Sequence, residues 1–408
     1  MTARALITGI GVVAPNGLGA KEYWNATLEG RAGIAPLTRF DASRYASRLA
    51  GQVLDFDPAD LLPNRLLPQT DVSTRLALVA AEQALADGGV DPAGLVDFDL
   101  GVITANASGG FAFTHREFAN LWSKGPEFVS VYESFAWFYA VNTGQVSIRH
   151  RLRGPGAALV AEQAGGLDAL GHARRSLRLG TPLVVTGGVD SALDPWGWAA
   201  HLSGGLVSDS DDPDRAYLPF DTLARGHVPG EGGAFLIMED EEGARRRGMD
   251  RCYGELAGYA ASFDPPPGSG RPPALRRAAE LAIADAGLTP ADIGVVLADA
   301  AGTADLDRSE AEAITAVFGA HGVPVAAPKV LTGRLLAGGG PLDVVAALLA
   351  LRDGLIPAVP YEGETPAAYG LDLVRGAPRP TSARAALVLA RGRWGFNSAV
   401  VVKAADRA

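Results

Sequence analysis

The sequence predicts an α/β fold, in which helices cover β-sheets, and two observations carry this prediction. Apolar runs of strand length alternate with amphipathic stretches of helix length along the whole chain. Hydrophobic residues make up 48% of the 408 residues and charged residues only 20%, so the chain can form a large core and is not disordered. This length accommodates two domains or one large duplicated domain.

The expected strands are short, and glycines interrupt the first of them. They occupy 4–13, 100–105, 157–161, 183–186, 234–238, 295–298, 386–390 and 399–403. Helices are expected at 76–86 and 165–179, and the apolar run at 157–161 leads directly into the second helix. Strands that alternate with helices in this way favour sheets covered by helices.

The helix at 165–179 has the clearest periodicity. Its apolar positions recur at helical spacing and form one face: Leu167, Leu170, Ala173 and Leu177. The opposite face carries Arg174, Arg175 and Arg178. Pro182 then breaks the helix before the next strand.

Two breaks indicate how the chain is organised. A dense charge cluster lies at 239–250, and a proline- and glycine-rich loop follows at 264–270. We therefore predict an N-terminal half at 1–245 and a C-terminal half at 246–408. Strand–small-residue–helix units occur in both halves, at 101–110 and 295–303, which indicates an internal duplication.

Charge and cysteine content exclude several classes of protein. The chain has 36 Lys and Arg against 46 Asp and Glu, a net charge of −10, so nucleic acid and anionic membranes are unfavourable partners. Its single cysteine excludes a disulfide framework and a multi-cysteine zinc site. No signal peptide and no apolar run of about 18 residues is evident, so we expect a cytoplasmic protein.

Three segments resemble cofactor or metal sites only superficially. Gly9–Ala14 fits a loose dinucleotide fingerprint, but Pro15-Asn16-Gly17 makes a turn where a helix should begin. Gly230–Gly233 leads into a strand, whereas a phosphate-binding loop leads into a helix. The acidic residues at 209–214 lack a suitably placed downstream Glu for calcium. We expect no bound cofactor and no metal.

The segment 158–170 carries the most information about function. An apolar strand runs into small residues and then into the amphipathic helix, a geometry that presents one side chain over the helix N-terminus. A Cys or Ser is suited to this position in enzymes, because the helix end and nearby amides stabilise negative charge. Here the residue is Gln163, whose amide is no nucleophile. From the pattern alone, a structural glutamine remains the alternative.

This segment resembles the nucleophile elbow of the β-ketoacyl-ACP synthases, with Gln163 in the position of the catalytic Cys. Segments that resemble other parts of that family follow in order: 219–221 with 230–232, 296–303, 329–334 and 392–395. The resemblance places Asp299 and Arg334 where the family has its two catalytic His residues, and Lys329 is retained. Arg393 replaces the Phe of the glycine-rich gating loop. The resemblance implies a thiolase-like layered αβαβα fold made of two duplicated halves.

The lost residues form one pattern, since the nucleophile and both imidazoles are gone while the surrounding segments remain. Condensation needs a thiolate to hold the acyl chain and His side chains to stabilise the enolate formed on decarboxylation. This set of changes, with the string 160–169 and the stretch 129–145, resembles the chain length factors (KSβ subunits) of type II aromatic polyketide synthases. The similarity is greatest to factors of actinorhodin-type octaketide systems.

The resemblance implies a function within a complex. A KSβ subunit pairs with a catalytic KSα, and the poly-β-keto chain grows into a tunnel along their interface. The substrate is presented on the phosphopantetheine of an acyl carrier protein. The family's chain-length gate maps onto Phe111, Thr114, Phe118 and Trp196, and positions 111, 114 and 118 recur on one helical face. Bulky residues there are consistent with a chain of about eight acetate units.

Other functions stay open at this point. Gln163 could help to decarboxylate malonyl-ACP and so supply the acetyl primer. The chain could instead be a stand-alone decarboxylase or a non-catalytic acyl-binding scaffold. Whether the chain is itself an enzyme is therefore uncertain, because it lacks the Cys-His-His set of the acyltransferase family that it resembles.

Overall fold

Two groups of strands with the same topology form the centre of the computed structural model, which describes residues 4–96, 98–249, 251–266 and 268–405. The N-terminal group has the order β1-β8-β7-β5-β6, and the C-terminal group has the order β9-β16-β15-β10-β11-β13. In each group the first two pairings are antiparallel and the following ones are parallel. This repeated topology confirms the two duplicated halves.

The strands of the N-terminal group are β1 (Ala5–Ala14), β8 (Gly232–Asp240), β7 (Leu183–Asp190), β5 (Leu100–Ala105) and β6 (Gly156–Leu159). Those of the C-terminal group are β9 (Gly254–Phe263), β16 (Phe396–Ala404), β15 (Ala385–Arg391), β10 (Val295–Leu297), β11 (Pro324–Ala326) and β13 (Asp372–Leu373). A short pairing of β1 with β9 joins the two groups. Minor strands are β2 (Gly17–Leu18), β3 (Ile34–Pro36), β4 (Leu49–Gly51), β12 (Leu355–Ile356) and β14 (Arg379–Pro380).

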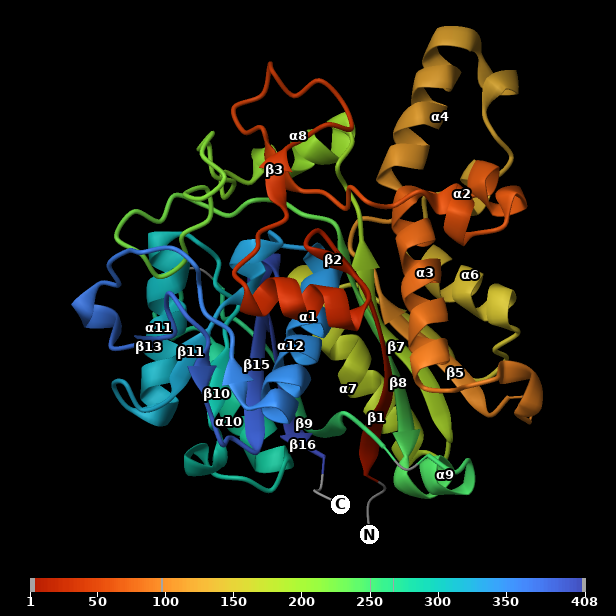
Figure 1. The fold of residues 1–408 in the computed structure, drawn as a ribbon. Coiled ribbons are helices and arrows are strands. Elements are labelled where there is room, and N and C mark those ends of the chain that lie inside the picture. The colour runs from red at the N-terminus through yellow and green to blue at the C-terminus, as the bar shows by residue number, and fades with distance from the viewer. Residues whose placement is uncertain (1–3, 97, 250, 267, 406–408) are drawn as a thin grey trace.

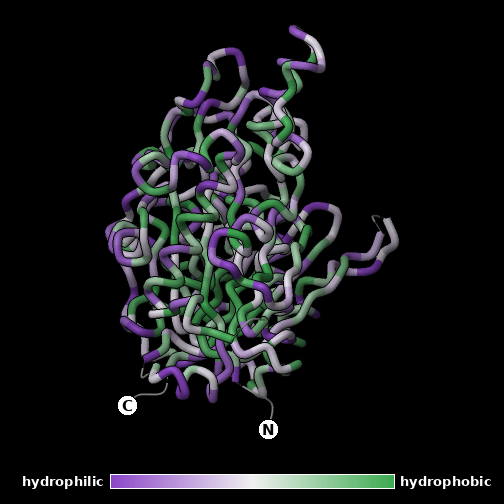
Figure 2. Tube along the Cα trace, turned by 90° about the vertical axis from the view of Figure 1, so that its right-hand side faces the viewer, coloured by the Kyte–Doolittle hydropathy of each residue, from purple (hydrophilic) through white to green (hydrophobic). Residues whose placement is uncertain are grey.

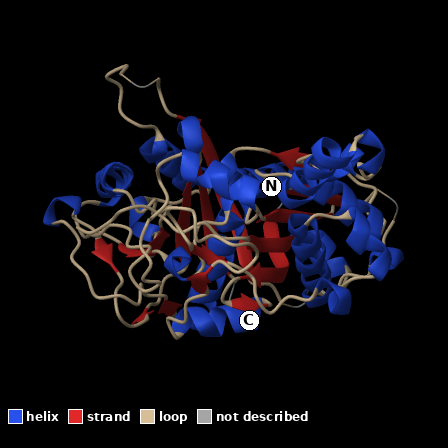
Figure 3. Ribbon diagram, turned by 90° about the horizontal axis from the view of Figure 1, so that it is seen from above, coloured by secondary structure: helices blue, strands red, loops and turns tan. Residues whose placement is uncertain are grey.

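Helices form three layers around the strands (Figures 1 and 3). The central layer holds α7 (Gly165–Arg178) and α12 (Gly339–Asp353), which contact each other and strands of both halves. The outer layers hold α3 (Val72–Asp87) and α6 (Val141–His150) on the N-terminal half, and α10 (Leu275–Asp285) and α11 (Ala304–Phe318) on the C-terminal half. The layered αβαβα fold is thus confirmed.

The remaining helices lie at the ends and edges of the layers. They are α1 (Ala20–Leu28), α2 (Pro58–Leu61), α4 (Phe111–Lys124), α5 (Glu133–Ala136), α8 (Pro195–Ser203) and α9 (Glu241–Arg246). The predicted division at 245/246 falls within α9, between the last strand of one half and the first of the other, and stays a prediction. Among the described residues, no helix is both long enough and apolar enough to cross a membrane.

One arginine of α7 is buried in the central layer. Arg174 lies on the arginine-bearing face of the helix, but it is only 6% exposed. Its guanidinium forms an ion pair with Asp285 of α10 and donates to the carbonyl of Ala257 on β9. Arg175 and Arg178 of the same face are exposed, so only the part of this face at Arg174 meets the C-terminal half.

The same layer contains a helix that periodicity does not reveal. Residues 339–351 of α12 are all buried, and Asp343 is the one charged residue among them, so no amphipathic pattern remains to be read. Figure 2 shows hydrophobic residues concentrated in the interior, with hydrophilic ones toward the periphery. One hydrophobic cluster includes residues of α7, α12 and strands from both halves, so the two halves share a core.

Candidate functional site

The strand-to-helix elbow lies where β6 meets α7. A single 3-10 turn, Glu162–Ala164, separates the strand from the helix. Glu162 has a φ of +51°, in the left-handed region that non-glycine residues rarely adopt, and this turn places Gln163 at the start of the helix. Gln163 is 4% exposed.

The side chain of Gln163 is engaged with the backbone of Leu336. With the amide nitrogen facing the Leu336 carbonyl, it donates to that oxygen at 3.0 Å and its oxygen accepts from the Leu336 N–H at 3.2 Å. Leu336 opens the short turn Leu336–Gly338 that precedes α12 and has a φ of +51°. Gln163 therefore ties the elbow to the start of the central helix.

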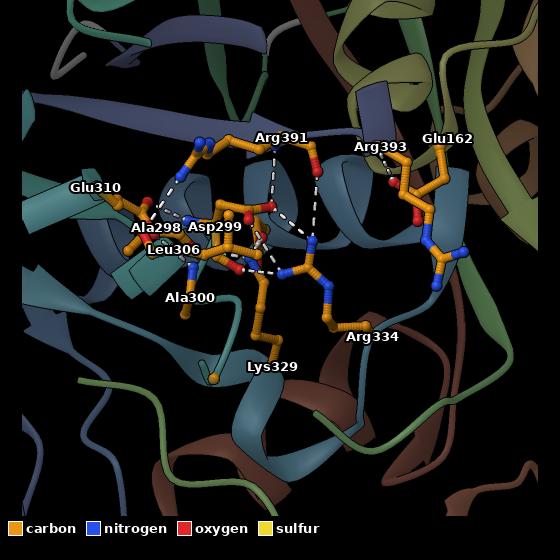
Figure 4. Close-up of polar contacts among 12 residues, drawn as sticks. Glu162, Ala298, Asp299, Ala300, Leu306, Glu310, Lys329, Arg334, Arg391 and Arg393 are labelled. Atoms are coloured by element: carbon orange, nitrogen blue, oxygen red, sulfur yellow. Dashed lines mark hydrogen bonds and ion pairs between the residues drawn. The ribbon is translucent and has the colours of Figure 1, made fainter. Parts of the chain in front are cut away.

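Asp299 and Arg334 form a buried ion pair beside the elbow (Figure 4). The guanidinium binds both carboxylate oxygens, with Nη1–Oδ2 of 3.1 Å and Nη2–Oδ1 of 3.0 Å, and also donates to the Asp299 carbonyl at 2.8 Å. Their side chains are 3% and 7% exposed, respectively. The two residues predicted to replace the catalytic histidines thus bind each other.

The electrostatics keep this pair ionised. Burial alone would raise the pKa of Asp299, but the adjacent Arg334 and Lys329 charges hold that pKa below its usual value. Burial alone would lower the pKa of Arg334, but Asp299 raises it above its usual value. Neither group can exchange a proton near neutral pH, which general acid–base chemistry requires.

The ion pair also holds the loop that follows β15. The N–H of Arg391 donates to Asp299 Oδ1 at 3.0 Å, and Arg334 Nη2 donates to the Arg391 carbonyl at 3.3 Å. Two residues on, the N–H of Arg393 donates to Glu162 Oε2 at 2.9 Å. The segment predicted to correspond to a gating loop is therefore held by the Asp299–Arg334 pair at Arg391 and by the elbow at Arg393 (Figure 4).

Lys329 is buried and has two oxygen partners. Its Nζ lies 2.6 Å from Asp343 Oδ2 on α12 and donates to the carbonyl of Ala298 at 2.6 Å. Burial raises the pKa of Asp343 despite the neighbouring Lys329 charge. Lys329 thus links the Asp299 turn to the central helix.

The sequence did not reveal Glu310, a buried residue of α11. Its two carboxylate oxygens accept the N–H groups of Asp299 and Ala300 at 2.6 and 2.8 Å. Burial, followed by the nearby Asp299 charge, raises the pKa of Glu310 to about 7. The sequence of α11 does not distinguish Glu310 from the other acidic residues of this helix, since its partners are backbone groups of a different segment.

A cavity of about 720 Å³ adjoins the elbow. Gln163, Asp299 and Arg334 line one part of it, and small residues of the loops and of α8 line much of the remainder. Two histidines that the sequence analysis did not assign, His201 and His227, also line it. Burial, with the nearby Arg393 charge, lowers the pKa of His201 to about 4; burial and Arg334 also lower that of His227.

Aromatic residues of α4 and α8 meet beside this cavity. The ring of Trp196 lies 5.0 Å from that of Phe111 and 5.6 Å from that of Phe118, between ring centroids. Phe111 lines the cavity, whereas Phe118 and Trp196 are not among its lining residues. Thr114 is buried on the same helix. We call Phe111, Phe118 and Trp196 the aromatic gate.

The structure thus brings the sequence-predicted residues into two groups. Gln163, Asp299, Lys329 and Arg334 surround the elbow, and the aromatic gate lies at α4 and α8. Phe111 connects the groups, because it lines the same cavity as Gln163. Within the described part of the chain, no three His, Cys, Asp or Glu side chains gather as a metal site.

Comparison with known families defines the class of protein. The sequence matches the β-ketoacyl synthase N-terminal domain over residues 3–243 and the β-ketoacyl synthase C-terminal domain over residues 253–360. The chain therefore belongs to the β-ketoacyl synthase family.

Individual relatives narrow this class. The chain is 65% identical to the actinorhodin polyketide putative beta-ketoacyl synthase 2 of Streptomyces coelicolor, over 98% of each chain. It is 54% identical to the tetracenomycin polyketide synthase ketoacyl synthase beta subunit of Streptomyces glaucescens, again over 98% of each. These relatives confirm the resemblance to KSβ subunits of type II polyketide synthases.

Solved structures agree with this assignment. The ishigamide ketosynthase/chain length factor matches with a TM-score of 0.91 at 25% identity, over 100% of both chains. A chain of AntDE:AntF, described as a type II polyketide synthase acyl-carrier protein in complex with its ketosynthase bound to the hexaketide, matches with a TM-score of 0.88 at 26% identity. That match covers 99% of this chain and 100% of the other.

Proposed function

We propose that this chain is the non-nucleophilic subunit of a type II polyketide synthase condensing complex. It pairs with a catalytic KSα and sets the length of the poly-β-keto chain through a tunnel at their interface. The proposal rests on how the side chains at the elbow are engaged. The Gln163 amide is hydrogen-bonded to the backbone of Leu336, and Asp299 and Arg334 form an ion pair with each other.

This arrangement gives a reason for the partner. Carbon–carbon bond formation in this family requires a thiolate that takes the acyl chain and groups that stabilise an enolate. A carboxamide provides no nucleophile, and the negative charge of Asp299 would oppose an enolate. The chain retains the scaffold and the cavity, so a second subunit has to provide the reacting groups.

The surface beside the elbow supports pairing with KSα. Strand β6 is the last strand of its sheet order, and large apolar side chains are exposed directly after it and in the segment 128–139 that follows α4. These are Phe128, Val131, Trp137, Phe138, Tyr139 and Val160, of which Val131 is 77% exposed. Exposed apolar side chains gathered in one region favour a protein–protein interface.

The same surface opens into the cavity. Tyr139 and Val160 are exposed and also line the cavity that contains Gln163 and Phe111. A KSα subunit docked over these residues would cover the open side of the cavity and extend it into a tunnel. The aromatic gate would then form a wall beyond Phe111.

We infer that the substrate arrives on the phosphopantetheine of an acyl carrier protein and that the growing chain enters this tunnel. Two phenyl rings and an indole at the gate leave less room than small side chains would. Together with the 65% identity to the actinorhodin relative, this supports a product of about eight acetate units.

Co-expression with a KSα of an actinorhodin-type system tests the proposal. We expect the two chains to co-purify and, with carrier protein and malonyl donors, to produce one predominant polyketide length by mass spectrometry. KSα alone and this chain alone are the controls. Turnover by this chain alone would support a stand-alone decarboxylase, and failure to associate with KSα would contradict the proposal.

A further inference from the structure

The first turn of α8 is organised by one carboxylate. Asp194 caps this helix, with Oδ1 accepting from the Gly197 N–H and Oδ2 from the Trp196 N–H, both at 3.1 Å. Such caps satisfy N–H groups that have no partner within the helix. The cap therefore fixes the backbone of Trp196, a residue of the aromatic gate.

The same carboxylate also contacts α4. Nδ1 of His115 lies 2.9 Å from Asp194 Oδ2, the oxygen that accepts from Trp196. His115 is four residues after Phe111 and three before Phe118, so the three side chains share one face of α4. Asp194 therefore links the helix that carries both phenylalanines to the turn that carries the tryptophan.

A directional contact matters here because the ring contacts are less directional. The rings of Phe111 and Phe118 lie tilted against Trp196, and such packing tolerates sliding and small rotations. The N-terminus of α4 is held separately, since the N–H of Phe113 donates to buried Asp71 at 2.8 Å. Beyond that anchor, α4 extends away from the sheets (Figure 1), so the contact at His115 limits how this helix moves against α8.

We propose that His115, acting through Asp194, is a positioning residue for the aromatic gate. By holding α4 against the first turn of α8, it sets the separation of the three rings and so the sharpness of chain-length selection. This inference rests on the proposed function of the gate. His115 is not a catalytic residue, because it acts through Asp194 and Trp196.

The test compares variants in the complex with KSα, with the distribution of product lengths as the readout. For His115→Ala, we expect the ratio of off-length to normal-length product to rise by up to about fivefold. This upper limit follows from the small free energy that a partly exposed contact such as that between His115 and Asp194 contributes. His115→Asn, which keeps an N–H donor close to the Nδ1 position, should restore much of the selectivity. His172→Ala, at an exposed histidine of α7, is the matched control and should leave the ratio unchanged.

A double-mutant cycle examines the route through Asp194. Asp194→Asn retains a good helix cap but removes the negative charge, so it should shift the ratio in the same direction by a smaller factor. Combined with His115→Ala, it should add less than its single effect. If His115→Ala prevents assembly with KSα, the Asp194→Asn variant alone tests the proposal. An unchanged distribution of product lengths in that variant would overturn the proposal.

Phe118→Ala separates this inference from the proposed function. If Phe118→Ala leaves product length unchanged, the gate itself is wrong. If Phe118→Ala lengthens the product, the gate stands and the His115 variants decide the positioning role. That role is refuted if His115→Ala leaves the distribution of product lengths sharp, or if His115→Asn broadens it as much as His115→Ala does.

Discussion

Replacing Asp299 by Asn should destabilise this protein strongly. The substitution removes the charge that neutralises Arg334 and places an amide N–H₂ against a guanidinium that it cannot bind. Asp299 accepts from two nitrogens of Arg334 and from the Arg391 N–H, and only one acceptor oxygen would remain.

The magnitude follows from burial. The side chains of Asp299 and Arg334 are 3% and 7% exposed, so water cannot replace the lost partner. Removing one member of a buried ion pair costs about 3–5 kcal/mol, a large part of a typical total stability of about 5–15 kcal/mol. The double variant Asp299→Asn/Arg334→Met should recover much of this loss, because no unpaired charge remains.

The chain contains a matched control. Asp372 and Arg379 form a similar two-point contact, with distances of 2.6 and 2.9 Å, but their side chains are 33% and 39% exposed. Asp372→Asn should therefore cost at most about 1 kcal/mol. Urea unfolding of the purified full-length variants measures both values. A loss for Asp299→Asn as small as that for Asp372→Asn would refute the reasoning.

Further predictions concern the gate, the elbow and pH. Phe118→Ala removes a ring that lies 5.6 Å from Trp196, so the complex with KSα should release polyketides longer by at least one two-carbon unit, detectable by mass spectrometry. Gln163→Ala removes both hydrogen bonds to Leu336 and should lower the free energy of unfolding by about 1–3 kcal/mol. Formation of the acetyl-ACP primer from malonyl-ACP should continue in the complex with KSα. Loss of acetyl-ACP formation in a folded variant would instead establish a catalytic role for Gln163. The pKa of Glu310 is raised from 4.5 to about 7, so the folded protein binds the proton of this carboxyl group more tightly than the unfolded chain does. The stability that this proton contributes is therefore lost as pH rises from about 4.5 through 7. Glu310→Gln should flatten that part of the stability profile between pH 5 and 7.5, and an unaltered slope in urea titrations would contradict the assignment.

Local sequence signals were sufficient for much of the fold. The apolar run before Gln163 and the amphipathic helix after it correctly predicted a strand-to-helix elbow. Strands such as β5 and β8 were also found, because each contains its own short apolar run. These features depend on neighbours in the sequence, so pattern analysis can recover them.

The buried central layer was harder to predict for a physical reason. Residues 339–351 of α12 are all buried, and Arg174 of α7 is buried although Arg175 and Arg178 are exposed. Amphipathic patterns report contact with water, so they cannot reveal a helix such as α12 that protein surrounds on every side.

The sequence by itself placed Gln163 at a strand-to-helix elbow, and the family resemblance predicted that Gln163 replaces the catalytic Cys and that Asp299 and Arg334 replace the two His residues. Only the tertiary structure decided what those residues do: Asp299 and Arg334 bind each other across 35 positions, and the Gln163 amide binds the backbone of Leu336. It also decided that His115 meets Asp194 at the aromatic gate. Such contacts join segments far apart in the chain, and their geometry is set by the packing of layers, which no local pattern encodes.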